Sequence, residues 1–365
     1  MNRRHIEPLL QDAFINMKFF ATVSDFDIVS VIFPSRNVLL DANGLRIRCL
    51  STGKIAGRVV DQESPFWERM KNYHPPGFRL VQAKLSEFAE HWRDDAIVPY
   101  TNSDIRLELV DQFGIPVMAD AVFTWHAKKT LPLPSRENIV RIAGDVGHVG
   151  FLFGGSTWFG RLQALTRRYY GRDIESLNNV LDWGVGCARI GRHLLERGFP
   201  HLYGADIDQL NIDWLQSNLG WKNAVRVDFD PPMPFSDNFF DLVYGHSVFT
   251  HLSEQDQDRW LKELHRVLRP GGFAFVTTCG EGGVYHTRYR DILNRPHVVE
   301  AFLETGFYDF ESQSSVGVDV GREGYYRLVA HTRSYVMHHW SKFFAVRRIL
   351  PCFMDHQDLV VLQKI

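Results

Sequence analysis

The sequence contains little cysteine and no long apolar run. Its four cysteines, Cys49, Cys187, Cys279 and Cys352, lie far apart and form no Cys-x-x-Cys pair. This spacing argues against a structural zinc site and against the disulfide framework of a small secreted domain, and we expect no bound metal. No uncharged apolar run approaches the roughly 18 residues of a membrane-spanning helix, so we expect no membrane span.

The sequence also lacks a strong charge of either sign. The formal net charge is −2, which leaves no global basic field to attract nucleic acid or anionic lipid. We therefore expect no nucleic-acid partner. The opening segment carries Glu7, Pro8 and Asp12 where a signal peptide would have an apolar core. We expect a cytoplasmic protein.

The length of 365 residues allows two domains of ordinary size. Residues 1–130 contain several short candidate strands separated by turn signals, which predict a β-rich, sandwich-like accessory domain. The clearest pair is IRLELV at 105–110 and the extended stretch 115–125, joined by DQFG, which predicts a hairpin. A linker with a Pro-rich start is expected over 131–150, and the accessory domain would select substrate or form a homodimer.

Residues 151–365 alternate between strand-like and helix-like segments. This rhythm predicts a parallel sheet with helices on both faces. The expected strands cover 179–183, 201–206, 223–229, 239–245 and 273–278, and the expected helices 156–170, 188–197, 208–218 and 254–268. Ser253 is the expected N-cap of the last helix.

Glycines follow the first of these strands directly, in the segment Asp182-Trp-Gly184-Val-Gly186. A parallel sheet opens a crevice at the carboxyl ends of its strands, and glycines there let the backbone approach a ligand without interference from Cβ. A dinucleotide fingerprint would need a third glycine at position 189, where the sequence has Arg189. This difference counts against a dehydrogenase.

Asp206 ends the second predicted strand, 20 residues after Gly186. A carboxylate at that place accepts hydrogen bonds from the ribose hydroxyls of a nucleoside. The alternative is that Asp206 caps the helix that follows. Together, a ribose-binding acid and a missing pyrophosphate motif indicate S-adenosylmethionine, a nucleoside cofactor that has no pyrophosphate.

Four stretches carry a family resemblance: VLDWGVGCARIGRHL, LYGADID, PPMPFSDNFFDLVYGHSVFTHL and LHRVLRPGGFAFVTT. In their order and spacing, the C-terminal two thirds of the chain resembles the class I S-adenosylmethionine-dependent methyltransferases. The resemblance implies a doubly wound, Rossmann-like α/β domain with a mostly parallel seven-stranded sheet. The family's first motif usually has a third glycine, and here Ala188 stands in its place.

The resemblance also implies which residues contact S-adenosylmethionine. They are Asp182, Gly184 and Gly186 around the methionine part, Asp206 at the ribose, Ile207, Asp228 and Phe229 at the adenine, and Tyr244 facing the sulfonium and the substrate. Asp230 competes with Asp228 for the adenine amine.

Histidines are the candidate general bases. His246 follows the fourth strand, His286 follows the fifth, and His251 precedes a helix, where a structural hydrogen bond is its alternative role. His331 is a further candidate for reaching the cleft. We predict O-methylation of a small polar metabolite or glycan precursor, with nitrogen and carbon acceptors left open. The alternative is a catalytically inactive S-adenosylmethionine-binding or interaction module.

Overall fold

The computed structural model describes most of the C-terminal two thirds of the chain and shorter segments before it. The described residues are 20–24, 28–34, 44–50, 52–59, 78–88, 105–115, 122–125, 131–143, 147–285, 295–310, 322, 324–354 and 357–365.

Internal contacts divide the chain into two compact units. The C-terminal unit contains Ser176–Gly186 and Pro200–Ile365, and the other unit contains Lys18–Glu175 and Cys187–Phe199. Residues 151–175 therefore group with the N-terminal unit, although they were assigned to the second domain on sequence. The predicted boundary at 151 rests on the start of the family resemblance, and it stays a prediction.

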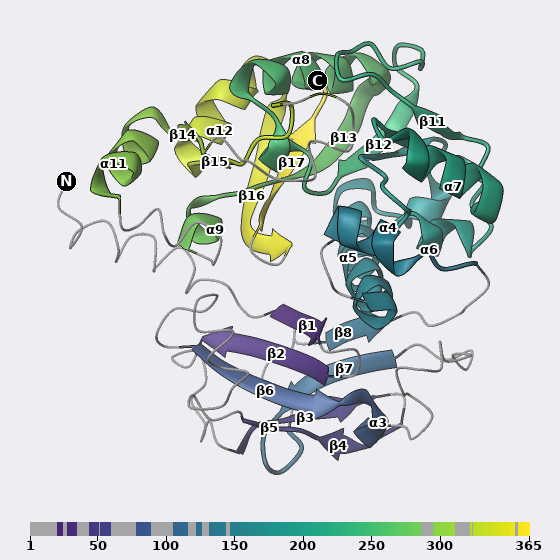
Figure 1. Ribbon diagram of the computed structural model, residues 1–365, viewed down its shortest axis with the longest axis vertical. Helices are drawn as coiled ribbons and strands as arrows, with labels where there is room; N and C mark the ends of the chain where they lie inside the picture. Colours follow the sequence, from purple (N-terminus) through teal and green to yellow (C-terminus); the bar gives the residue numbers. More distant parts are fainter. Residues whose placement is uncertain are drawn as a thin grey trace. The chain divides into compact units, whose positions relative to one another are not determined.

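The C-terminal unit is built on a seven-stranded sheet with the order β11-β10-β9-β12-β13-β17-β16 (Figure 1). Its strands are β9 (Val180–Trp183), β10 (Leu202–Asp206), β11 (Ala224–Arg226), β12 (Phe240–Gly245), β13 (Leu268–Thr278), β16 (Ala345–Met354) and β17 (Gln357–Gln363). The first five run parallel to one another, whereas β17 runs antiparallel to both β13 and β16. The predicted Rossmann-like, mostly parallel sheet is confirmed.

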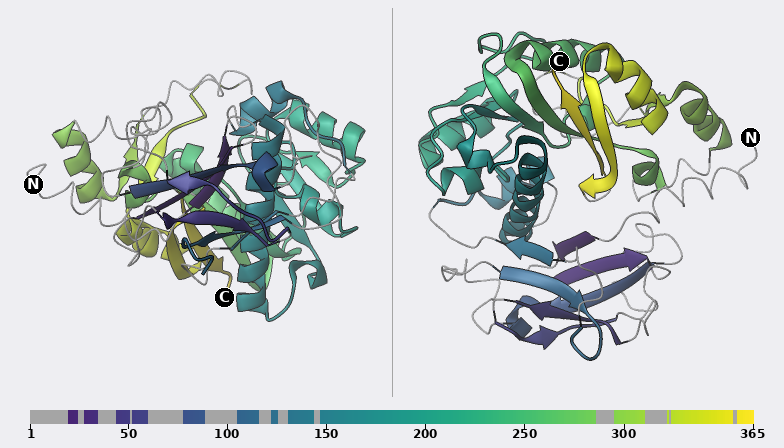
Figure 2. Two further views of the ribbon diagram at one scale, coloured as in Figure 1. Left: turned by 90° about the horizontal axis from the view of Figure 1, so that it is seen from below. Right: turned by 180° about the vertical axis from the view of Figure 1, so that it is seen from behind.

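Strand β9 is the point at which the winding of the sheet reverses. It pairs with β10 on one side and with β12, the fourth of the parallel strands in chain order, on the other. Beyond β12, the green strand β13 lies beside the yellow C-terminal strands β17 and β16 (Figure 2, right). Strands β9 and β12 are buried along their whole lengths, as central parallel strands are. Ligands of open α/β sheets bind outside the carboxyl ends of the strands at such a switch point.

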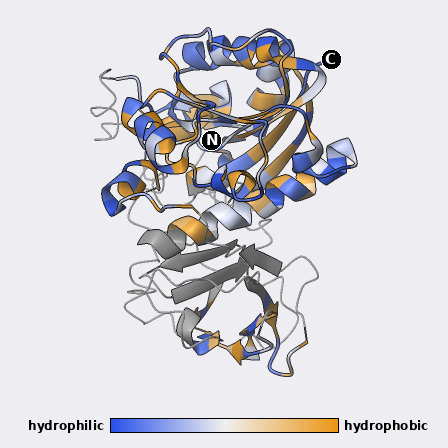
Figure 3. Cartoon of the chain, turned by 90° about the vertical axis from the view of Figure 1, so that its right-hand side faces the viewer, coloured by the Kyte–Doolittle hydropathy of each residue, from blue (hydrophilic) through white to orange (hydrophobic). Residues whose placement is uncertain are grey.

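The described part of this unit also contains several α-helices. They are α7 (Gln209–Leu219), α8 (Glu254–Val267), α9 (Glu281–Tyr285), α11 (Pro296–Thr305) and α12 (Arg333–His339), and a small sheet pairs β14 (Phe307–Asp309) with β15 (Val329–His331). Trp260 of α8 and Trp340, just after α12, lie in one core cluster with the strands. Figure 3 shows hydrophobic residues concentrated on the strands of the large sheet, whereas the helices carry both hydrophobic and hydrophilic residues.

The other unit contains two antiparallel four-stranded sheets, ordered β1-β2-β6-β5 and β4-β3-β7-β8. Their strands are β1 (Phe20–Ser24), β2 (Ile28–Pro34), β3 (Arg46–Cys49), β4 (Ile55–Ala56), β5 (Arg58–Val59), β6 (Phe78–Lys84), β7 (Ile105–Val110) and β8 (Val122–Trp125). The predicted hairpin is confirmed, since β7 pairs with β8 and the Gly114 N–H donates to the Asp111 carbonyl at 3.0 Å. The sandwich-like packing stays a prediction.

Helices of this unit are α3 (Leu85–Phe88), α4 (Arg136–Ala143), α5 (Gly147–Tyr170) and α6 (Arg192–Leu195). The helix expected over 188–197 is reduced to α6, because Ala188 has a left-handed φ of +61° that a helix does not admit. In the part of the chain that the structure describes, no helix has both the length and the apolarity needed to cross a bilayer.

Ser253 caps α8 as predicted. Its Oγ accepts a hydrogen bond from the Asp256 N–H at 3.2 Å. Replacing Ser253 by Ala removes this acceptor, so we expect the free energy of unfolding to fall by about 1 kcal/mol. Ser253→Gly is the matched control and is expected to cost only a few tenths. Urea unfolding followed by tryptophan fluorescence measures both, and equal losses in the two variants would contradict the cap.

Candidate functional site

The side chain of Asp206 lies at the carboxyl end of β10 and joins two neighbouring strand ends. Its Oδ2 accepts from the Gly186 N–H at 2.7 Å, and its Oδ1 accepts from the Asp208 N–H at 2.8 Å. The cap of α7 is Asp208, whose carboxylate accepts from the Leu210 N–H at 3.0 Å. The alternative in which Asp206 caps that helix is therefore wrong.

Burial raises the pKa of Asp206 to about 6, although the hydrogen bonds from Asp208 and Gly186 act in the opposite direction. The side chain is thus a carboxylate held in a largely desolvated place. The Asn211 side chain also hydrogen-bonds to this carboxylate, and two oxygens can together accept about four hydrogen bonds. The two neighbouring hydroxyls of a ribose can each donate a hydrogen bond, so a ribose fits this carboxylate as a ligand.

The turn after β9, residues 184–188, is called the glycine elbow below. Its glycines have positive φ angles, and one of them lies very close to a neighbouring side chain. Gly184 has φ +72°, and a Cβ built on it would lie 2.5 Å from Val248 Cγ2. Gly186 has φ +52° and donates its N–H to Asp206. Ala188 adopts a left-handed conformation where the family has glycine, at a cost of about 1 kcal/mol. The elbow therefore keeps its backbone path despite the missing glycine.

Asp182 and Tyr244 form a buried pair across β9 and β12. They are register partners, and the Tyr244 O–H donates to Asp182 Oδ2 at 2.9 Å. Burial, and then the nearby carboxylate, raise the pKa of Tyr244 well above its ordinary value. The phenol therefore stays neutral and acts as a hydrogen-bond donor. Contact of either residue with a cofactor remains a prediction.

Two acids follow β11, and their surroundings differ. Asp230 is engaged by Arg259 at 2.6 Å and by Arg322 at 3.0 Å. The Asp228 side chain is 77% exposed and lies 3.4 Å from Arg226. Asp230 is therefore held by two arginines, and Asp228 is the better candidate to accept a hydrogen bond from an adenine amine. Phe229 and Ile207, expected at the adenine, are both half-buried beside the core cluster.

The candidate histidines occupy different environments. His246 is half-buried directly after β12. The His251 Nδ1 lies 3.0 Å from the Arg327 carbonyl, which favours its structural alternative. His331 is fully buried with its Nε2 2.9 Å from Gln257 Oε1, and burial lowers its pKa to about 3. The expectation that His331 reaches the cleft is wrong. His286 lies outside the described residues.

Three further polar residues at this edge of the sheet were not found from the sequence. Ser247, Thr277 and Gln357 are hydrogen-bonded to one another. Gln357 stands 110 positions after Ser247 and enters the edge on the antiparallel strand β17. Because no local spacing relates the three residues, no motif indicates them.

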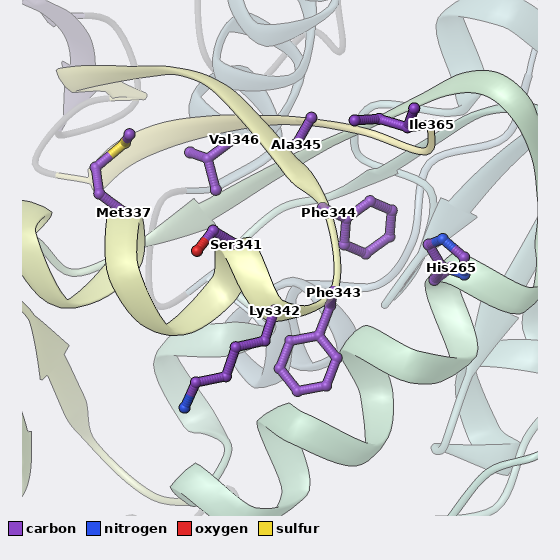
Figure 4. Close-up of a pocket in the computed structure, with 9 residues that line it drawn as sticks. All are labelled: His265, Met337, Ser341, Lys342, Phe343, Phe344, Ala345, Val346 and Ile365. Atoms are coloured by element: carbon purple, nitrogen blue, oxygen red, sulfur yellow. The ribbon is translucent and has the colours of Figure 1, made fainter.

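A surface hollow of about 360 Å³ lies elsewhere on this unit (Figure 4). Its lining residues are His265, Met337, Ser341, Lys342, Phe343, Phe344, Ala345, Val346 and Ile365. None of them belongs to the predicted site, and they come from the end of α8, the region of α12 and the start of β16. The candidate functional site is therefore the group of strand ends where the buried carboxylates of Asp182 and Asp206 lie.

The fold and these strand ends define a Rossmann-like domain suited to a ribose-containing ligand. Residues 181–276 match a family model described as a methyltransferase domain. The C-terminal part of the chain thus contains a methyltransferase domain, as its resemblance to the class I S-adenosylmethionine-dependent methyltransferases implies.

Individual relatives are more distant. Over 30% of its length the chain is 27% identical to Methyltransferase GfsG of Streptomyces halstedii, covering 41% of that protein. Over 38% of its length it is 30% identical to a sarcosine/dimethylglycine N-methyltransferase of Halorhodospira halochloris, covering 50% of it. A solved SAM-dependent methyltransferase of Methanosarcina mazei is 18% identical, with 55% of this chain and 97% of that chain covered and a TM-score of 0.40. The chain thus spans half or less of the length of these two curated relatives.

The raised pKa of Asp206 predicts a pH-dependent stability. Its folded-state pKa of about 6 lies above the ordinary 3.8, so this group stabilises the fold fully below about pH 4 and loses that contribution as pH rises through about 6. We expect a loss of up to about 3 kcal/mol from this group.

The measurement compares urea unfolding of the parent and of Asp206→Asn across this pH window. Because Asn does not ionise, the difference between the two stability curves isolates the carboxyl group from all other titrations. Curves that stay parallel from low to neutral pH would contradict the assignment.

Proposed function

We propose that this chain is a methyltransferase that uses S-adenosylmethionine to methylate a hydroxyl of a small polar metabolite or glycan precursor. The observation that carries the proposal is the buried Asp206 carboxylate, bonded to Gly186 at the elbow of a methyltransferase domain. Desolvating a carboxylate is costly unless hydrogen bonds compensate, and the two hydroxyls of a ribose would add such bonds.

The residues present fit this cofactor. Asp206 would bind the ribose, Gly184 and Gly186 would admit the methionine part, and Asp228 with Phe229 would meet the adenine. Packing also requires a glycine at position 184, because a Cβ there would lie 2.5 Å from Val248 Cγ2. When bound, S-adenosylmethionine supplies a methyl carbon that its sulfonium makes electrophilic. Alignment of acceptor, methyl and sulfur, together with exclusion of water, is the task of the protein.

His246 is the proposed general base. It lies at the carboxyl end of β12, next to the switch-point strand β9, and imidazole accepts a proton near neutral pH. His246 would take the hydroxyl proton while the acceptor oxygen forms its bond to the methyl carbon. A bound S-adenosylmethionine would supply the methyl group for this bond, and its sulfur would keep the electron pair of the carbon–sulfur bond. A nitrogen acceptor, as in the name of the Halorhodospira relative, would need the same alignment.

The N-terminal unit completes the proposal. We infer that it selects the acceptor or forms homodimer contacts, because its strands lie outside the residues that match the methyltransferase model. An interaction module without catalysis is the competing function. It would bind the cofactor and release no S-adenosylhomocysteine with any acceptor.

Cofactor binding is tested by calorimetry with S-adenosylmethionine and, separately, with NAD. We expect binding of the former only, weakened about tenfold to a hundredfold in Asp206→Ala, since a charged hydrogen bond contributes roughly 1.5–3 kcal/mol. Asp213→Ala, which removes an exposed carboxylate on α7, is the matched control and should bind like the parent. Heat with NAD and none with S-adenosylmethionine would refute the proposal.

Turnover is tested by release of S-adenosylhomocysteine from a panel of hydroxylated and amine metabolites. On an acceptor of the panel that the parent methylates, we expect His246→Ala to lower kcat by about a hundredfold or more, because general-base catalysis contributes roughly 10²–10⁴. His201→Ala removes an exposed histidine at the start of β10 and should leave kcat unchanged. Undiminished kcat in His246→Ala would remove the base assignment.

A further inference from the structure

Ser247 holds an unusual backbone conformation directly after His246. Its φ is +61°, in the left-handed region that favours glycine. A non-glycine residue persists there only where its surroundings compensate a cost of order 1–3 kcal/mol. Ser247 is compensated by side chains, since its N–H donates to Thr277 Oγ1 at 2.7 Å and the Thr250 hydroxyl donates to its carbonyl at 3.0 Å.

The hydrogen bonds around Ser247 close into a ring with one direction. Thr277 Oγ1 accepts from the Ser247 N–H and donates to Gln357 Oε1 at 2.5 Å. The Gln357 Nε2 donates in turn to Ser247 Oγ at 2.9 Å. The amide of Gln357 thus accepts from Thr277 and donates to Ser247, and it links the two hydroxyl groups. Thr277 and Gln357 are 1% and 5% exposed, so water does not compete for these bonds.

The sheet itself does not need this ring. The last pair between β12 and β13 is Gly245 with Val276, and Thr277 pairs through its backbone with Leu359 of β17. A valine at 277 would keep the strand and almost the same volume. The side-chain hydrogen bonds of the ring act instead on the turn after β12. They link this turn to β13 through Thr277 and to β17 through Gln357.

The residue that this turn presents is His246, between the end of β12 and Ser247. We propose that Thr277 and Gln357 are positioning residues, which act through Ser247 to set the imidazole of His246 for proton transfer. This role rests on the proposed function, in which His246 is the general base. Buried polar networks that are fully satisfied specify one local arrangement more sharply than apolar packing does, and misplacement by about 1 Å costs roughly 10²-fold in rate.

The primary test reads the position of His246 without any substrate. In protein labelled with ¹³C at histidine Cε1, the His246 signal is assigned by its absence from His246→Gln. We expect Thr277→Val and Gln357→Met to shift or broaden this signal. Thr277→Ser keeps the hydroxyl and should leave the signal at the parent position. An unmoved signal in Thr277→Val, or an equal displacement in Thr277→Ser, would overturn the proposal.

A second readout separates positioning from loss of structure. With S-adenosylhomocysteine as the probe, we expect Thr277→Val to bind like the parent within a few-fold. Its kcat on an acceptor of the panel should fall about tenfold to a hundredfold, and Thr277→Ser should restore it. Failure of the parent to bind the probe would refute the proposed function, whereas the histidine signal still decides the positioning role. Equal losses of probe affinity and kcat in Thr277→Val would overturn positioning in favour of a purely structural role.

Discussion

A carboxylate buried between two strand ends is the constraint on which the site depends. Asp206 ties the tip of β10 to the elbow after β9 through the Gly186 N–H, and to the start of α7 through the Asp208 N–H. If either hydrogen bond to Asp206 were broken, a buried polar group would be left without its partner. That loss costs more free energy than the net contribution of an ordinary hydrogen bond. The elbow, the strand and the helix start therefore hold one arrangement together.

A second buried carboxylate binds the switch-point strand on its other side. Asp182 of β9 accepts from Tyr244 of β12, the neighbour opposite to β10. The carboxyl end of β9 is thus fixed on both flanks by polar contacts inside an otherwise apolar sheet. Pre-formed polar groups at the ends of rigid strands are the kind of arrangement that holds a ligand in a reactive orientation.

Two of the candidate histidines in this unit make contacts that support the structure. His331 bonds to Gln257 in the core, and His251 holds the segment at Arg327. His246 stands at the strand end beside the hydrogen-bonded ring of Ser247, Thr277 and Gln357. The same ring explains how a serine occupies a backbone conformation that ordinarily requires glycine.

The sequence by itself determined the alternation of strands and helices in the C-terminal part, the cap at Ser253 and the two acids at Asp182 and Asp206. Each of these is a local signal, since apolar runs, capping residues and strand-end acids are read within a few positions. The predicted parallel strands match β9 to β13 for this reason. The start of the helix predicted over 188–197 was wrong, because Ala188 keeps a left-handed conformation that alanine itself does not favour.

Only the tertiary structure decided which of the candidate polar residues come together. It assigned the cap of α7 to Asp208 instead of Asp206, engaged Asp230 with arginines, and buried His331 in the core. It also brought Gln357 to Ser247 across the sheet. These outcomes depend on contacts between residues far apart in the chain, and strand order and burial set such contacts, which local spacing does not encode.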